Sequence, residues 1–269
     1  MTRAEIYREI EEMLGLVPGF FKLQPDSSLE AEWQMYKRME FDEGAVPGKY
    51  RQLIGLAVSA ATRCHYCTFY HTEVSKGWGA KDAEIEAAVH VAKSAMGWGT
   101  YFEGLQFQFD PRKADALKAC ARDWKKAIEA QKKMSDQELH KQLNQQFEQM
   151  LGPMPPAMRA SSDAAVRAEW QLFTQTWFEE GAIPQKYRHL MGLAVAAVTR
   201  SRSGAHLHTT LAKAFGASDA EIEDAVHYAK FTAGWSAYGN GMQLDYEQFK
   251  DEVARACRHI REARKVAAA

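Results

Sequence analysis

The chain has 269 residues, of which 46% are hydrophobic and 26% are charged, and its formal net charge is −1. This balance argues against a nucleic-acid-binding protein, which usually carries a basic face. No apolar run reaches the roughly 18 residues of a membrane-spanning helix, and the N-terminal segment lacks the apolar core of a signal peptide. We therefore expect a soluble, cytoplasmic protein. In a reducing compartment, its four cysteines do not indicate a structural disulfide framework.

Helical periodicity dominates the chain, and no stretch alternates with the period of two that is typical of a strand. The first half is predicted to contain an amphipathic helix over 6–14 and, after a loop with glycine and proline, an aromatic-rich helix over 29–41. A largely buried helix follows over 48–61, and a helix with two cysteines ends near Gly79. These patterns predict an all-α protein.

The ends of the later helices can also be read from the sequence. Asp82 is a predicted N-cap, and Ser218 with Glu221 has the spacing of a capping box in the second half. The charged stretch from Ala114 to Met134 is predicted to be helical and to join the two halves of the chain.

The chain contains an internal repeat with an offset of 137 residues and no gap. Residues 47–51 align with 184–188, and residues 82–86 align with 219–223. A repeat of this length indicates two related units. We place the first unit at 1–130 and the second at 131–269.

The two copies differ at the cysteines. Cys64 aligns with Ser201 and Cys67 aligns with Gly204, whereas His71 aligns with another histidine. Cysteines that only filled a core would have little reason to be confined to one copy. The asymmetry indicates one redox-competent unit and one unit that serves as a scaffold.

The thiol segment is the main candidate for chemistry. An α-helix advances about 100° per residue, so Cys64, Cys67 and His71 share one face. Free N–H groups at a helix start stabilise a thiolate, and a histidine one turn later can shuttle a proton. Arg63 adds positive charge beside the pair, and Tyr66 lies between the two cysteines. The spacing favours reversible disulfide chemistry.

Two other interpretations of this segment stay open. Zinc could be bound by Cys64, Cys67 and His71, with His65 or a remote residue as the fourth ligand. No second ligand pair stands nearby in the sequence, so we expect no metal. The cysteines could also be core residues, although their absence from the second copy argues against this.

The sequence pattern around the thiols is specific. Its positions are Pro47, Lys49, Arg51, Leu53, Ile54, Leu56, Ala57, Val58, Cys64, Cys67, His71, Thr72, Gly79, Asp82, Glu84 and Ile85. In these residues the chain resembles the alkylhydroperoxidase D-like and carboxymuconolactone decarboxylase superfamily, over residues 47–106 and again over 184–243. The resemblance implies two all-helical repeats packed as a pseudo-dimer. In the thiol-bearing branch it also implies a peroxide-reducing or disulfide-exchanging activity.

The resemblance also implies residue roles. Cys67 would react with peroxide, Cys64 would resolve the product, and His71 would belong to a proton relay. The family's peroxidases have a glutamate twelve residues before the first cysteine, where this chain has Gln52. Glutamine can form hydrogen bonds but cannot exchange a proton at neutral pH. Either another acid such as Glu43 serves in its place, or the relay is weaker.

Three functions follow from these patterns. The first is a thiol-dependent peroxidase or disulfide oxidoreductase that uses the CxxC pair. The alternative is a carboxymuconolactone decarboxylase-like enzyme that acts on a lactone without thiols, with His208, His189 and Arg188 as pocket candidates in the second repeat. The third is a non-enzymatic interaction or structural protein.

The expected partners follow from the redox hypothesis. The sequence has no flavin, nucleotide or haem signature, so we expect no bound cofactor and a separate source of electrons. Besides a peroxide or another small substrate, the protein would need a thiol reductant such as a lipoyl domain or a thioredoxin-like protein. Because the superfamily usually forms trimers or hexamers, we expect a homo-oligomer of three two-repeat chains.

Overall fold

The computed structural model describes residues 1–267, with side chains up to residue 263. Every regular element in this part of the chain is helical, which confirms the predicted all-α class. None of these helices is long and apolar enough to cross a membrane. The α-helices are α1 (Arg3–Leu14), α2 (Gly19–Lys22), α3 (Asp26–Glu40), α4 (Gly48–Thr62), α5 (His65–Gly77), α6 (Asp82–Gly104), α7 (Ala114–Arg122), α8 (Trp124–Gln131), α9 (Asp136–Met150), α10 (Asp163–Trp177), α11 (Gln185–Val198), α12 (Arg202–Ala214), α13 (Asp219–Gly241) and α14 (Tyr246–Ala267). Short 3₁₀ turns lie at Pro111–Lys113 and Pro156–Ala160.

The two repeats pack against each other as a pseudo-dimer. Helices α3 to α6 correspond to α10 to α13 at the offset of 137 residues. The equivalent helices α4 and α11 lie side by side at the centre. There the rings of Tyr50 and Tyr187 stack with centroids 3.7 Å apart and an interplanar angle of 13°. The predicted pairing of repeats is therefore confirmed.

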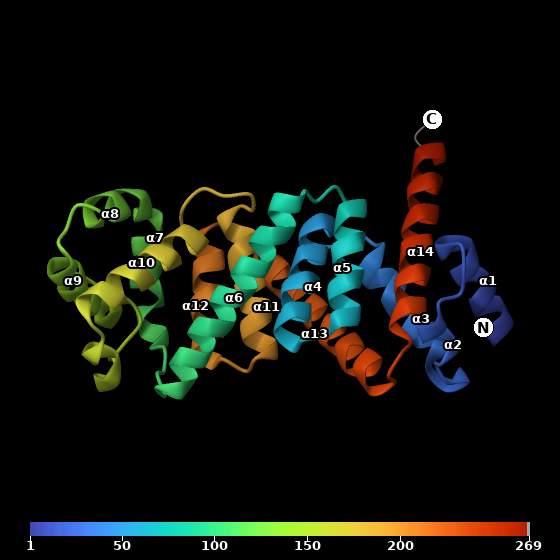
Figure 1. Cartoon of the computed structure of the whole chain (residues 1–269), viewed down its shortest axis with the longest axis horizontal. Coiled ribbons are helices and arrows are strands. Elements are labelled where there is room, and N and C mark those ends of the chain that lie inside the picture. The colour runs from blue at the N-terminus through green and yellow to red at the C-terminus, as the bar shows by residue number, and fades with distance from the viewer. Residues whose placement is uncertain (268–269) are drawn as a thin grey trace.

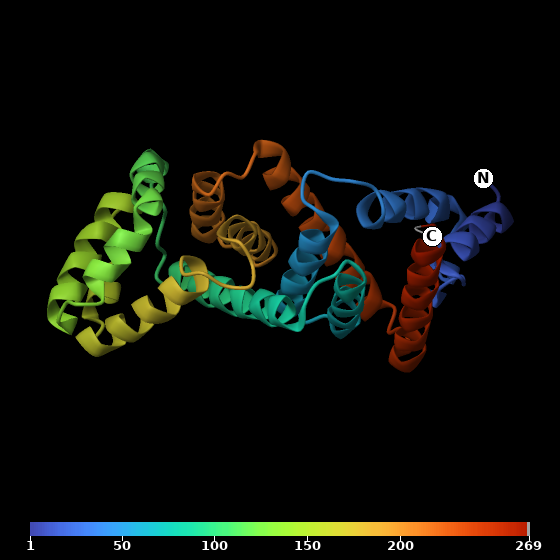
Figure 2. The same cartoon turned by 90° about the horizontal axis from the view of Figure 1, so that it is seen from above.

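The long helices α6 and α13 pack on helices of both repeats. Helix α13 of the second repeat packs on α4 and α5, while α6 of the first repeat packs on α11 and α12. In the same way, α14 lies against α5 and α1, and α7 lies against α12. The molecule is elongated, with α1 to α3 and α14 at one end and α7 to α10 at the other (Figures 1 and 2). Helix α5, which carries the thiol segment, and its counterpart α12 are thus each in contact with helices from both repeats.

Most predicted helix ends agree with the structure, with two corrections. The predicted capping box of Ser218 and Glu221 is present at the start of α13. Lys81, not Asp82, is the N-cap of α6, and the Glu84 carboxylate accepts the backbone N–H of Lys81 at 2.9 Å. The single helix predicted over 114–134 is divided into α7 and α8, which meet at Asp123.

Candidate active site

A tight turn between α4 and α5 places the thiol pair. Arg63 ends α4 in a left-handed conformation with φ of 56°, and its side chain is exposed. The turn is closed by the backbone N–H of Cys64, which donates to the Ser59 carbonyl at 3.1 Å. Cys64 is the N-cap of α5, and its Sγ accepts the backbone N–H of Cys67 at 3.3 Å. The predicted position of the CxxC pair at a helix start is confirmed.

The two sulfurs are in direct contact. Cys64 Sγ and Cys67 Sγ are 2.9 Å apart, and both cysteines are free thiols. Cys64 has no exposed surface, and Cys67 is 6% exposed. The hydroxyl of Ser236, from α13, donates to Cys67 Sγ at 3.3 Å. Because a disulfide bond measures about 2.05 Å, the sulfurs need to approach by only about 0.9 Å to bond.

The contact between the two sulfurs shifts the pKa values of the two thiols in opposite directions. The pKa of Cys64 falls from 9.0 to about 6, chiefly because the S–H of Cys67 donates to its sulfur, with help from the backbone N–H at the helix start. The pKa of Cys67 is strongly raised by the same contact and by burial. The pair therefore loses its first proton easily and holds its second, so that one proton is shared between the sulfurs at neutral pH.

His71 is a neutral side chain with defined partners. Burial lowers its pKa to about 3. Its Nδ1 lies 2.8 Å from Oε1 of Gln52, and its Nε2 lies 3.4 Å from the hydroxyl of Thr232. These contacts do not favour the zinc interpretation, which needs a ring nitrogen beside the thiols. Within residues 1–263, no group of three or more His, Cys, Asp or Glu side chains is placed to hold a metal ion.

Glu40, at the end of α3, is the acidic residue that is hydrogen-bonded to Gln52 and, through it, connected to His71. Its carboxylate accepts Nε2–H of Gln52 at 2.6 Å and the hydroxyl of Tyr228 at 2.8 Å. Glu40 is 3% exposed, and burial raises its pKa. Glu43, the acid that the sequence suggested, lies exposed in the loop after α3, and the side-chain amide of Gln52 is hydrogen-bonded to Glu40 and His71 instead. The suggestion of Glu43 is therefore corrected to Glu40.

An aromatic cavity adjoins the thiols and encloses about 470 Å³, its open side included. Cys67 and His71 both line it, whereas Cys64 does not. The predicted supporting residue Tyr66 forms part of its wall, and the Tyr66 hydroxyl donates to the carbonyl of Leu244 at 2.6 Å. The other lining residues are Phe20, Tyr36, Tyr70, Phe231, Thr232, Trp235, Gly239, Leu244 and Phe249.

The second repeat supplies part of this site. Tyr228, Thr232 and Ser236 lie one turn apart on α13, and all three side chains point into the thiol site of the first repeat. The second repeat is therefore more than the scaffold that the missing thiols suggested. The sequence contains a signal that could have indicated these residues: their counterparts on α6 lack the side-chain hydroxyl groups that form these hydrogen bonds. Those counterparts are Val91, Ala95 and Gly99.

The candidate residues of the second repeat form a closed aromatic cluster. His189 Nδ1 and His208 Nδ1 are 3.3 Å apart, and both pKa values are lowered by burial. The ring of His189 is stacked between Trp177 and Phe215 at 5.2 and 5.3 Å. This packing encloses the two imidazoles, which are 0% and 3% exposed.

Arg188 has a structural role at the end of α10. Its guanidinium donates to the backbone carbonyls of Ile183, Thr176 and Glu179, at 2.7, 2.8 and 2.6 Å. These bonds occupy all three guanidinium nitrogens. They use three of its five N–H donors, and Arg188 is only 5% exposed.

Comparison with known proteins identifies one family. The sequence profile described as the carboxymuconolactone decarboxylase family matches the chain twice, over residues 29–107 and 164–244. No match was found among curated proteins or among solved structures. The two matched regions cover most or all of α3 to α6 and of α10 to α13, the equivalent helices of the two repeats.

Proposed function

The chain belongs to the carboxymuconolactone decarboxylase family, and we propose that it acts as a thiol-dependent peroxidase that reduces organic hydroperoxides. The observation that carries this proposal is the contact of 2.9 Å between Cys64 Sγ and Cys67 Sγ beside an aromatic cavity. A pair with one easily lost proton supplies a nucleophilic thiolate and a second thiol to resolve its product.

The proposed reaction starts from the pair with one shared proton. The proton settles on Cys64, and the Cys67 thiolate attacks the terminal peroxide oxygen. The O–O bond breaks, Cys67 becomes a sulfenic acid, and the alkoxide takes a proton from solvent through His71. The Cys64 thiol then gives its proton to the relay and attacks the Cys67 sulfur. Hydroxide leaves and is protonated to water, so the products are an alcohol, water and a disulfide.

Cys67 is the proposed point of attack because of its position. Of the two thiols, only Cys67 lines the cavity, and the Ser236 hydroxyl donates to its sulfur. Cys64 is sealed behind it and holds the first-formed thiolate. A proton moving across the contact converts the buried thiolate of Cys64 into an attacking thiolate at Cys67.

The cavity supports an organic rather than an inorganic peroxide. Its walls are mainly aromatic rings, and burying an apolar substrate against them releases about 25 cal/mol per Å² of apolar surface. Hydrogen peroxide has no apolar surface to bury. We therefore propose that kcat/KM rises with the apolar size of the hydroperoxide until the cavity is full.

The cycle needs a reductant, because the disulfide must be opened before a second turnover. A thiol reductant, on a lipoyl group or a thioredoxin-like protein, fits this step by thiol–disulfide exchange. We also propose the assembly of three chains. Light scattering that gives the mass of a single chain at micromolar concentration would contradict that assembly.

The test is to count thiols before and after one equivalent of tert-butyl hydroperoxide. The wild type should lose two of its four thiols and recover them with dithiothreitol. The Cys120→Ser/Cys257→Ser variant is the matched control, and it should lose both of its remaining thiols at the wild-type rate. In Cys64→Ser, a dimedone adduct should form on Cys67, whereas Cys67→Ser should give no adduct on Cys64.

Two results would overturn the proposal. One is a wild-type protein whose four thiols survive the hydroperoxide. The other is a Cys64→Ser/Cys67→Ser variant that keeps full activity on a lactone substrate, which would favour the decarboxylase-like alternative of the same family.

A further inference from the structure

We infer that Glu40 is a positioning residue which, acting through Gln52, fixes the tautomer of His71. This inference deepens the proposed function, since it assigns the group that keeps the relay histidine ready to accept a proton. The three side chains come from α3, α4 and α5, and hydrogen bonds of 2.6 and 2.8 Å connect them in series.

The direction of the hydrogen bonds carries the argument. An ionised carboxylate can only accept, so Gln52 must turn its NH₂ group toward Glu40 and its carbonyl oxygen toward His71. The carbonyl oxygen can in turn only accept, so the proton of the imidazole lies on Nδ1. Nε2 then carries the lone pair on the side of Thr232, which also lines the cavity. The carboxylate thus decides which ring nitrogen is basic.

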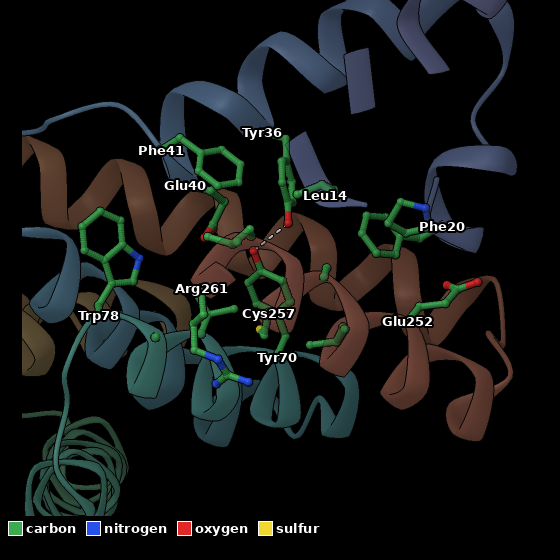
Figure 3. A pocket seen from close by; sticks show the side chains of 16 residues that line it. Leu14, Phe20, Tyr36, Glu40, Phe41, Tyr70, Trp78, Glu252, Cys257 and Arg261 are labelled. Atoms are coloured by element: carbon green, nitrogen blue, oxygen red, sulfur yellow. Dashed lines mark hydrogen bonds between the residues drawn. The ribbon is translucent and has the colours of Figure 1, made fainter. Parts of the chain in front are cut away.

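Burial raises the pKa of Glu40, and several neighbours oppose that rise by stabilising the carboxylate. Besides Gln52, the Tyr228 hydroxyl donates to it at 2.8 Å, and hydrogen bonding by Tyr70 opposes the rise of its pKa. The positive charge of Arg51 acts in the same direction. Glu40 also lies in the wall of a second cavity, beside the hydrogen-bonded hydroxyls of Tyr36 and Tyr70 (Figure 3).

The second repeat shows what the same framework looks like without the carboxylate. Trp177 stands at the position of Glu40, and His189 stands at the position of Gln52. His189 Nδ1 faces His208 Nδ1 at 3.3 Å, and the buried Nε2 of His189 has no hydrogen-bond partner. Either imidazole can be the donor in that pair. Among the side chains that the structure describes, no acceptor-only group is hydrogen-bonded to His208, and this repeat lacks the CxxC pair.

The first arm of the test reads the tautomer directly by ¹⁵N NMR of histidine-labelled protein, with His71 assigned through His71→Gln. Wild type should show the Nδ1–H form. In Glu40→Gln the new amide can donate as well as accept, so Gln52 can turn over and the Nε2–H form should become populated. Glu43→Gln is the matched control, because it removes an exposed carboxylate three residues away, and its spectrum should match wild type.

The second arm exchanges acid and amide. In Glu40→Gln/Gln52→Glu, the carboxylate contacts His71 directly, and the amide stands behind it. This variant should restore the Nδ1–H form. The rate at which tert-butyl hydroperoxide oxidises the thiol pair should fall by about tenfold or more in Glu40→Gln, within the usual range for acid–base assistance. In the exchange variant that rate should recover to within a few-fold of wild type.

The outcomes separate this inference from the proposed function. Glu40→Gln with an unchanged tautomer, or an exchange variant that shows the same tautomer as Glu40→Gln alone, would overturn the inference. A wild type that does not react with the hydroperoxide would remove the proposed function, yet the NMR arm would still decide the role of Glu40. If Glu40→Gln failed to fold, Gln52→Leu would be used instead. It removes the hydrogen bonds that link Glu40 to His71, so His71 should also lose its fixed tautomer in this variant.

Discussion

Replacing Cys67 by alanine should abolish most of the thiolate at Cys64. The S–H of Cys67 is the largest cause of the lowered pKa of Cys64, which stands at about 6 against an ordinary 9.0. With a pKa of about 6, roughly 90% of Cys64 is ionised at pH 7. With a pKa near 9, only about 1% is ionised, so the thiolate population should fall by about 90-fold.

The assay is the absorbance of the thiolate at 240 nm, followed as the reduced protein is titrated from pH 4.5 to 8. This method reads a buried sulfur without needing a reagent to reach it. Burial raises the pKa of Cys120 and brings that of Cys257 to about 11, so neither thiol should contribute in this range. Wild type should therefore show one step near pH 6 with the amplitude of a single thiolate.

In Cys67→Ala, the step should leave the titrated range, while Cys257→Ala should leave the curve unchanged. A step that stays near pH 6 in Cys67→Ala would refute the reasoning. It would mean that the backbone N–H groups at the start of α5, and not the neighbouring thiol, stabilise the thiolate.

Three further predictions concern stability. A Cβ on Gly55 would lie 2.5 Å from the His71 ring, and a Cβ on Gly192 would lie 2.7 Å from the His208 ring. Alanine at either position should therefore lower the free energy of unfolding in urea by about 2 kcal/mol. Only Gly55→Ala should also slow thiol oxidation. Burial holds the pKa of His189 well below 6.5, so below that pH the unfolded chain binds a proton that the folded chain does not. Acidification from pH 7 to 5 should therefore lower the free energy of unfolding by about 2 kcal/mol through this residue. His189→Leu should lose that part of the pH dependence of urea unfolding. Tyr50→Ala and Tyr187→Ala should be non-additive by about 1 kcal/mol in a double-mutant cycle, because the two rings stack on each other.

The fold could be predicted well because the signals that define it are local or repeated. Helical periodicity and capping residues act within a few positions, and the offset of 137 residues relates each helix of the core to a partner. The break at Asp123 was not predicted, because the charged stretch around it is helical on both sides and has no glycine or proline to mark the interruption. The packing of α6 and α13 across the two repeats depends on tertiary contacts, and no local signal encodes it.

The site could be predicted only in part. Cys64, Cys67 and His71 follow from spacing on one helix, and their proximity was expected. Glu40 lies 24 positions before the first cysteine. It contacts Gln52 only because the fold brings the end of α3 to α4. Glu43 was suggested as a replacement acid from the sequence, but it falls in the loop beyond the helix end, where its side chain is exposed.

The asymmetry between the repeats contains more information than the two missing thiols. At three positions one turn apart on α13, hydroxyl side chains occur only in the copy that faces the thiols, as at Ser236, whose counterpart is Gly99. In an assembly of two identical chains, each copy of α13 would have to serve the same kind of site. A tandem chain removes that restriction, because α13, which packs on the thiol segment, and α6, which packs on the second repeat, can differ in sequence. The donors of α13 and the thiols of α5 are therefore complementary parts of one site, and loss of either set should inactivate it.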